Sequence, residues 1–360
     1  MALFQGLIDQ AIQLNRIPQH SPLNLPFHPS NNIYKTVYFG LKIPHLDIPL
    51  HYLNFSCLMG QPHAPAFYQE HHLEKSIANT VSVHSSVSGH MIGAHHLYAL
   101  DTQCEILNHT INLNQKEQII GKPPYIEIHR EDEELSYQLK INTSEAVSYF
   151  NKLHLNMAEH WSVLCRVTGD VQYKKQNFNI NQLGALEYAR TLNFPYIAHA
   201  FYSYVLINLD ETQQLLCIQT RNASNEIIYS YAFIRDENTK STLFFEQTDF
   251  IIHRVYPQIK TAHGHSMYLA REFEWHCLTI DHKNQLKISG ECRGDYKFGV
   301  GEGFAGSFNY QITLNGNEYF GENGYLEYID CRALKWQEQN EQENKLEKNY
   351  KTASVLLKKP

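Results

Sequence analysis

The sequence predicts an all-β protein built from two tandem antiparallel β-domains, with a helical segment near each end. Between residues 34 and 335 the chain is a series of short alternating or β-branched runs bounded by Gly, Pro, Asn and acidic turns, which is typical of strands. The pattern also repeats, because Gly184–Arg190 reads GALEYAR and Gly324–Asp330 reads GYLEYID. A repeat of about 140 residues is too long for a solenoid unit and indicates two copies of one β-domain.

Length and composition are consistent with two globular cores. The chain has 360 residues, of which 43% are hydrophobic and 12% aromatic. Its net charge of −7 at pH 7 argues against the basic surface of a nucleic-acid-binding protein. The 7 cysteines include no CxxC motif, which is typical of a reducing compartment. With neither a signal peptide nor a transmembrane segment in the sequence, we expect a cytoplasmic protein.

The first element, within residues 1–33, is an amphipathic helix followed by a Pro- and Asn-rich lead-in. Apolar residues recur at three- and four-residue steps over residues 3–14, and the helix is expected to end before Pro18. We expect its apolar stripe to lie on the surface or at the mouth of a barrel. The alternative is peripheral contact of residues 3–14 with a membrane surface.

The two β-domains are expected over residues 34–193 and 194–336. GALEYAR closes the first domain, and the strand pattern begins again after it. Turns such as NLDETQQ and LNGN separate the strands of the second domain. About 140 residues of antiparallel strands can close a barrel of about eight strands, which removes unpaired edges. Residues 337–360 are rich in Glu, Gln, Asn and Lys and predict a polar tail, helical or disordered.

This layout resembles the tandem lipocalin-like proteins of the hydroxyneurosporene synthase (carotenoid hydratase) and AttH type. The resemblance spans residues 34–332 and lies in the two closing segments and in YFGLKI with SVHSSVSG. It is strongest to an uncharacterised bacterial branch with segments like LNFSCLMGQP and LEYAR. The resemblance implies two lipocalin-like β-barrels or sandwiches. It also implies an apolar ligand, since members hydrate isoprenoid double bonds, cyclise substrates or carry lipids. LEYARTLN stands where the hydratases have a Trp-rich stretch.

The repeated glutamates, Glu187 and Glu327, are candidate catalytic residues. Strand alternation places Glu187 on one face with alanines, and Tyr188 and Arg190 on the other. A carboxyl group buried beside apolar side chains has a raised pKa and can protonate a double bond or polarise a carbonyl. The alternative is an internal ion pair with an arginine such as Arg166 or Arg293.

The other faces of the closing strands supply candidate ligand-binding residues. These are Tyr188, Tyr328 and Arg190. The last positions of the two copies carry opposite charges, Arg190 and Asp330. Because equivalent elements of duplicated domains often pack side by side, we expect these two side chains to face each other.

Histidine is abundant, with 21 residues, and six of them lie between positions 71 and 96. His84, in the middle of the strand VSVHSSV, is the preferred single acid or base candidate. His263 and His265 form an HxH pair, but no partner at metal-ligand spacing follows, so we predict no metal site. GEGFAG matches a dinucleotide fingerprint but precedes a strand instead of a helix, so we predict no cofactor.

The strand around EFEWHC offers a second candidate pocket, with Trp275 and His276 as ligand-binding residues. Trp275 would form an apolar floor and His276 a polar handle, although a packed core tryptophan is the alternative. The sequence therefore predicts binding of an apolar or amphipathic small molecule in a barrel cavity. One alternative is a cofactor-independent hydratase, lyase or isomerase, and another is a structural or interaction protein with filled barrels. The sequence leaves the oligomeric state open.

Overall fold

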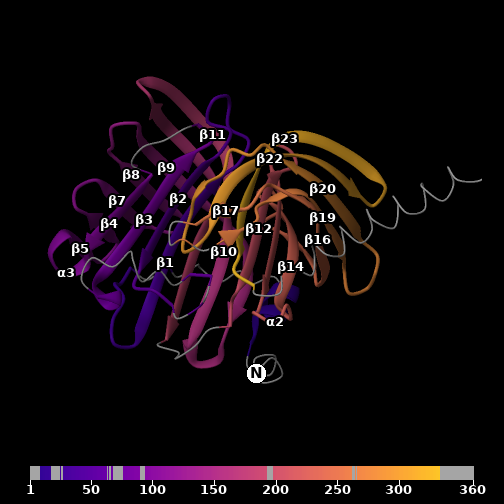
Figure 1. The fold of residues 1–360 in the computed structure, drawn as a ribbon, viewed down its shortest axis with the longest axis horizontal. Helices are drawn as coiled ribbons and strands as arrows, with labels where there is room; N and C mark the ends of the chain where they lie inside the picture. Colours follow the sequence, from indigo (N-terminus) through magenta and orange to yellow (C-terminus); the bar gives the residue numbers. More distant parts are fainter. Residues whose placement is uncertain are drawn as a thin grey trace, which may run out of the picture.

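The computed structural model describes residues 9–17, 25, 27–62, 64, 66–67, 76–89, 94–192, 198–261, 264 and 266–332. Most of them form two large antiparallel sheets that lie side by side, the first indigo to magenta and the second orange to yellow (Figure 1). Each sheet curls into a nearly closed barrel, whose two edge strands follow each other in the chain. The predicted fold, two tandem lipocalin-like β-barrels, is therefore confirmed.

The first barrel contains 11 strands. A short helix, α3 (Leu100–Gln103), connects its edge strands β4 and β5. In spatial order the strands are β4 (His95–Ala99), β3 (Thr80–Val87), β2 (Leu53–Met59), β1 (Tyr34–Ile43), β11 (Gln176–Leu192), β10 (Ala158–Tyr173), β9 (Leu135–Lys152), β8 (Tyr125–Arg130), β7 (Glu117–Lys122), β6 (Thr110–Leu113) and β5 (Cys104–Leu107).

The second barrel contains 10 strands, and two short strands, β17 (Ile259–Lys260) and β18 (Ser266–Met267), form a separate ribbon. Single-turn 3-10 helices span Ile77–Asn79 and His154–Asn156. In spatial order the barrel strands are β15 (Thr242–Phe245), β14 (Ile227–Asp236), β13 (Gln213–Arg221), β12 (Phe201–Asn208), β23 (Asn317–Asp330), β22 (Phe304–Leu314), β20 (Gln285–Cys292), β19 (Ala270–Leu278) and β16 (Gln247–Val255), with β21 (Lys297–Phe298) beside β22.

The repeat seen in the sequence corresponds to a repeat in topology. In each barrel four consecutive opening strands lie next to the closing strand, with the first opening strand paired to it. GALEYAR lies in β11 and GYLEYID in β23, so the two copies occupy equivalent strands. The boundary between the predicted domains stays a prediction, because residues 193–197 lie outside the described part of the chain.

Side-chain alternation gives each closing strand two buried faces. One face of β11 packs into the interior of the first barrel, where Tyr188 contacts Phe39 at a ring distance of 5.3 Å. The opposite face, which carries Glu187, is buried as well, because the second barrel covers it. Large apolar clusters fill both barrel interiors. The unusual environment is therefore the layer between the barrels, where polar side chains are buried.

Near the N-terminus, the described helix α2 (Ala11–Arg16) lies on the surface of the first barrel. Asn15 exchanges two hydrogen bonds with the Tyr149 backbone on β9, at 2.7 and 2.8 Å. Arg16 reaches the second barrel through an ion pair with Glu246 at 2.6 Å. Residues 3–8 of the predicted helix and the predicted tail 337–360 lie outside the described residues. Of the helices that the structure describes, none has the length and apolar composition needed to cross a membrane.

Candidate functional site

A cavity of about 740 Å³ lies between the two barrels. Its walls come from β1, β2, β10 and β11 of the first barrel and from β12, β14, β22 and β23 of the second. This location differs from the predicted one, inside a barrel, because the barrel interiors are packed with their own side chains. Most of the exposed wall is apolar, which is typical of pockets for small organic molecules. The apolar lining includes Leu58, Phe67, Leu153, Val300, Phe304 and Ile329.

Glu187 and Glu327, the repeated glutamates, meet at one lysine. Lys42 on β1 forms an ion pair with Glu187, and its Nζ lies 3.6 Å from Glu327 Oε1. Lys42 and Glu187 are completely buried, whereas Glu327 keeps 16% of its side chain exposed and lines the cavity. The two closing strands therefore approach each other through their glutamates.

The arginine partners predicted for these glutamates are wrong. Arg166 pairs with Glu237 on the outer part of the interface, and Arg293 pairs with Glu322. The cation that the glutamates share comes instead from the opening strand β1, which lies beside β11 in the sheet. The sequence does not point to Lys42, because it occupies a polar position of an alternating strand, and such positions are usually exposed to solvent.

The two glutamates have opposite pKa shifts because they share one cation unequally. Burial raises the pKa of Glu187, but the attraction of Lys42 and a contact with His160 outweigh it and hold this pKa below its usual value. Burial also raises the pKa of Glu327, and repulsion from Glu187 raises it further. The attraction of the more distant Lys42 does not bring this pKa back to its usual value. Two carboxyl groups with separated pKa values are suited to different roles, one as a fixed anion and one as an acid.

Two further polar groups of the cavity wall lie around Lys42. The Lys42 ammonium donates a hydrogen bond of 2.8 Å to the Tyr38 hydroxyl, and the Tyr325 hydroxyl donates one of 2.7 Å to Glu327. His160 Nε2 lies 3.9 Å from Glu187 Oε2. Tyr38, His160 and Glu327 all line the cavity. The wall therefore presents a phenol, an imidazole and a carboxyl group around one buried ammonium group.

A second buried cation extends this arrangement away from the cavity. Arg235, on β14, is completely buried and donates to the Ser162 hydroxyl at 2.9 Å and to the Gln214 amide oxygen. Ser162 is the cross-strand neighbour of Glu187. Burial lowers the pKa of Arg235, while Glu187 is one of the groups that raise it. Basic and acidic side chains therefore alternate from Arg235 through Glu187 and Lys42 to Glu327.

His199 adds an uncharged imidazole to the cavity wall. Burial lowers the pKa of His199 to about 4, so its ring is neutral at pH 7 and can both donate and accept a hydrogen bond. Its ring lies 5.9 Å from that of Tyr229, which also lines the cavity. This part of the wall therefore offers aromatic surface and neutral polar groups.

The predicted contact between Arg190 and Asp330 is wrong. Arg190 Nε lies 2.7 Å from Glu159 Oε1, and Asp330 Oδ1 lies 2.9 Å from Arg332 Nε. Both side chains are on the strand faces opposite Glu187 and Glu327, so each finds its partner within its own barrel. Arg190 nevertheless borders the cavity.

The predicted aromatic ligand-binding residues lie in the barrel interiors. Tyr188 and Tyr328 are buried, one in each barrel core. Trp275 is completely buried in the second barrel, with its ring 4.9 Å from that of Phe250. None of the three lines the cavity as the described residues define it.

The two predicted histidine candidates lie away from the cavity. His84 is buried on the outward face of β3, where its ring stacks on His95 at 4.2 Å. His276 lies on the outer surface of the second barrel and bonds to Glu274 at 3.0 Å. Trp275 and His276 therefore belong to opposite faces of β19 and do not share a pocket. His263 and His265 lie outside the described residues.

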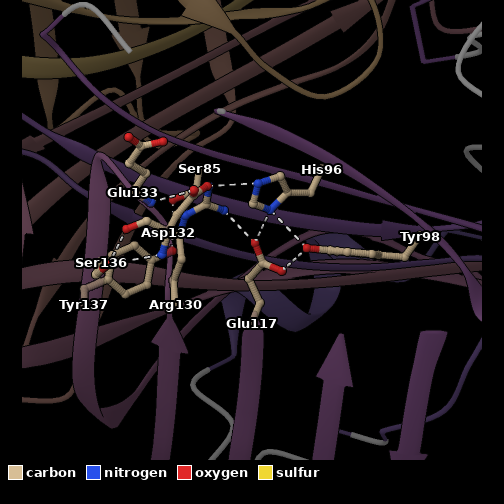
Figure 2. Close-up of polar contacts among 9 residues, drawn as sticks. All are labelled: Ser85, His96, Tyr98, Glu117, Arg130, Asp132, Glu133, Ser136 and Tyr137. Atoms are coloured by element: carbon tan, nitrogen blue, oxygen red, sulfur yellow. Dashed lines mark hydrogen bonds and ion pairs between the residues drawn. The ribbon is translucent and has the colours of Figure 1, made fainter. Parts of the chain in front are cut away.

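A second polar cluster closes the first barrel (Figure 2). Glu117 on β7 accepts from Arg130 on β8 at 2.6 Å and from Tyr98 on β4 at 2.7 Å. The His96 ring lies between two acids, with Nδ1 2.7 Å from Glu117 and Nε2 2.9 Å from Asp132. Because Glu117 is completely buried and both its oxygens are bonded, we assign the cluster to holding β4 against β7 and β8. Among the described residues, no group of three or more His, Cys, Asp or Glu side chains is arranged so that it could hold a metal ion.

Sequence reasoning missed Lys42, Tyr38 and His160. Tyr38 and Lys42 alternate in YFGLKI on the same strand face, two residues on either side of Gly40, and His160 lies in AEHWSV. The alternation shows that Tyr38 and Lys42 share one face of their strand. It does not show that a second barrel covers this face, or that His160 on another strand lies beside them. The available signal was Glu187 itself, because a buried carboxylate needs a cation nearby and β1 is the strand beside it.

A family model matches residues 56–343, which is more than half of the chain, and its description is a family of unknown function, DUF6670. The chain belongs to the DUF6670 family. No curated protein matches this DUF6670 chain significantly in sequence.

Solved structures are similar to this DUF6670 protein to different degrees. A protein of Nitrosomonas europaea described as an AttH has a TM-score of 0.58 and 13% identity, covering 88% of this chain and 99% of that chain. Kievitone hydratase from Nectria haematococca has a TM-score of 0.47 and 10% identity, covering 87% and 96%. CghA, in a structure with Sch210972, has a TM-score of 0.47 and 7% identity, covering 90% and 97%. The likeness to the AttH-type protein confirms the predicted resemblance at the level of the fold.

Proposed function

We propose that this DUF6670 protein binds an apolar or amphipathic small molecule in the cavity between its barrels. The observation that carries the proposal is the cavity itself, about 740 Å³ with a mainly apolar wall. Ligand pockets usually measure about 300–1,000 Å³ and combine apolar walls with a few placed polar groups. The apolar part of the ligand would contact side chains such as Leu58 and Phe304. Its polar group would lie near Tyr38, His160 and Glu327.

Two matched variants, in each of which tryptophan replaces an alanine, test this proposal with cis-parinaric acid, a fluorescent amphipathic probe. Ala189 lines the cavity, so Ala189→Trp should fill it and weaken probe binding at least tenfold. Ala78 is exposed on the 3-10 helix Ile77–Asn79, so Ala78→Trp should bind as the wild type does. Absence of saturable binding to the wild type, or equal binding by all three proteins, would contradict the proposal. Native mass spectrometry of protein from its own cells would identify the natural ligand.

A second candidate function is cofactor-independent catalysis on this ligand by a hydratase, lyase or isomerase. The observation that favours it is Glu327, a carboxyl group with a raised pKa that reaches the cavity. Such a group is better suited than an ordinary glutamate to deliver a proton to a bound molecule. Glu327→Gln should leave binding of the recovered ligand intact and abolish its conversion, followed by chromatography. Equal conversion by both proteins would exclude Glu327 as the acid.

A further inference from the structure

His160 differs from the other polar groups of the cavity wall because its two ring nitrogens have different surroundings. Nε2 is buried, has no hydrogen bond among the described residues, and lies 3.9 Å from Glu187 Oε2. The side chain keeps 19% of its surface exposed, where it lines the cavity. Because the ionised Glu187 faces Nε2, it favours the tautomer with the proton on Nε2 and leaves the lone pair of Nδ1 for the cavity. A carboxylate that faces one ring nitrogen of a histidine favours use of the other nitrogen as a general base.

Glu327 and Tyr38 place a carboxyl group and a phenol on the same part of the cavity wall. Both approach the same ammonium group, with Tyr38 Oη 2.8 Å and Glu327 Oε1 3.6 Å from Lys42 Nζ. Lys42 uses its protons on Glu187 and Tyr38 and is completely buried, so it does not reach the cavity itself. A phenol and a carboxyl group whose pKa is raised by burial and by repulsion from Glu187, both within a largely apolar pocket, form a site for an oxygen that gains negative charge.

We propose that this part of the cavity recognises the carbonyl group of an apolar ketone, with the Tyr38 hydroxyl and the Glu327 carboxyl group donating to the oxygen and His160 removing a proton from the adjacent carbon. This inference rests on the proposed ligand-binding function and assigns a substrate class to it. Glu187 is then a positioning residue, because its charge faces the buried nitrogen of the His160 ring and acts on the ligand only through that ring.

The proton transfer balances without a cofactor. The C–H bond next to the carbonyl breaks, and its electrons form the carbon–carbon double bond of an enolate, whose charge lies on the oxygen held by Tyr38 and Glu327. The proton forms an N–H bond at His160 Nδ1. Return of a proton to the same carbon restores the ketone, and its return to a carbon conjugated with the enolate moves a double bond. The chemistry is therefore enolisation or double-bond isomerisation.

Binding of 2-naphthol and naphthalene tests the oxygen site. 2-Naphthol mimics a planar enol, and naphthalene has the same frame without oxygen. The wild type should bind 2-naphthol roughly tenfold more tightly than naphthalene. Tyr38→Phe and Glu327→Leu should each lose this preference, whereas Glu327→Gln, which keeps a neutral donor, should retain much of it. Tyr310→Phe, which removes a hydroxyl that contacts His45 outside the cavity, is the matched control.

Exchange of the C1 protons of 2-tetralone in D₂O, followed by NMR, tests the base. The wild type should accelerate exchange, and His160→Gln should slow it about 100-fold, an effect far larger than its effect on 2-naphthol affinity. His253→Gln, on the outer surface of the second barrel, should exchange at the wild-type rate. If no probe binds the wild type, the ligand-binding proposal itself fails. If naphthalene and 2-naphthol bind equally, or exchange survives His160→Gln, ligand binding stands and the ketone site is refuted. Circular dichroism melts of each variant confirm folding.

Discussion

Replacement of Lys42 by methionine should be among the most destabilising single changes in this protein. Lys42 and Glu187 are completely buried, and a second carboxyl group lies 3.6 Å from the same ammonium group. Removing one partner of a buried ion pair costs about 3–5 kcal/mol of the free energy of unfolding, because the remaining charge has no counter-ion. Methionine fills a volume similar to that of lysine. The decrease in the free energy of unfolding therefore comes from the removed charge and not from altered packing.

The pH dependence of this loss is fixed by the pKa of Glu187. In the wild type its pKa is lower in the folded than in the unfolded state, so it contributes stability at neutral pH that is lost as the pH falls. In Lys42→Met the largest effect that lowers the pKa of Glu187 is gone, and burial outweighs the remaining contact with His160, so the folded pKa lies above the unfolded one and protonation at low pH relieves the penalty. The difference between wild type and variant should therefore be largest at pH 7 and shrink towards pH 4.

Denaturant titrations at both pH values, followed by tryptophan fluorescence, measure this effect. Trp161 lies in the first barrel core and Trp275 in the second. Lys240→Met, which removes only an exposed pair with Glu145, should cost less than about 1 kcal/mol. Lys42→Met/Glu187→Gln should be more stable than Lys42→Met alone. A loss below 1 kcal/mol at pH 7, or one that is the same at pH 4, would refute the assignment of a buried charge pair.

Three further predictions concern the rest of the molecule. Arg130→Met should lower the free energy of unfolding by about 3–5 kcal/mol, because it leaves Glu117 buried without its cation; a neutral result in denaturant titrations would contradict this. Burial raises the pKa of Glu274, but hydrogen bonds from histidine and lysine side chains outweigh this effect and lower the pKa to about 2. Glu274→Gln should therefore reduce the melting temperature slightly at pH 7 and not at pH 2, and a difference that persists at pH 2 would exclude this cause. Gly40→Ala should abolish the preference for 2-naphthol over naphthalene, since a Cβ there would lie 2.3 Å from the Tyr38 hydroxyl; unchanged binding would show that the hydroxyl can move freely.

The fold could be predicted because each strand carries its own alternation and the closing segments repeat. Both signals are local, and they remain valid whatever surrounds the strand. Glu187 and Glu327 could be selected for the same reason, since an acidic residue between apolar neighbours on one face is unusual in a strand.

The composition of the site could not be predicted, because it depends on which strand face is covered by the other barrel. Alternation separates Glu187 from Arg190 but does not say which of them faces the second barrel. The sequence predicted that the closing strands meet through Arg190 and Asp330. In the structure they meet through Glu187 and Glu327, which share Lys42, and Arg190 pairs with Glu159. The same limit applies to Trp275 and His276, which alternation separates into a barrel core and an outer surface.

The single lysine between two equivalent glutamates shows why this site needs unequal halves. In β1 the residue opposite Ala185 is Lys42, and in β12 the residue opposite Tyr325, at the matching position, is Leu206. A symmetric dimer of one barrel would carry either two lysines or none, so its two glutamates would be identical by symmetry and would have the same pKa. Fusion of the barrels into one chain allows the two copies to diverge. Loss of symmetry at one position is therefore enough to turn a repeated structural residue into an anion in one half and an acid in the other.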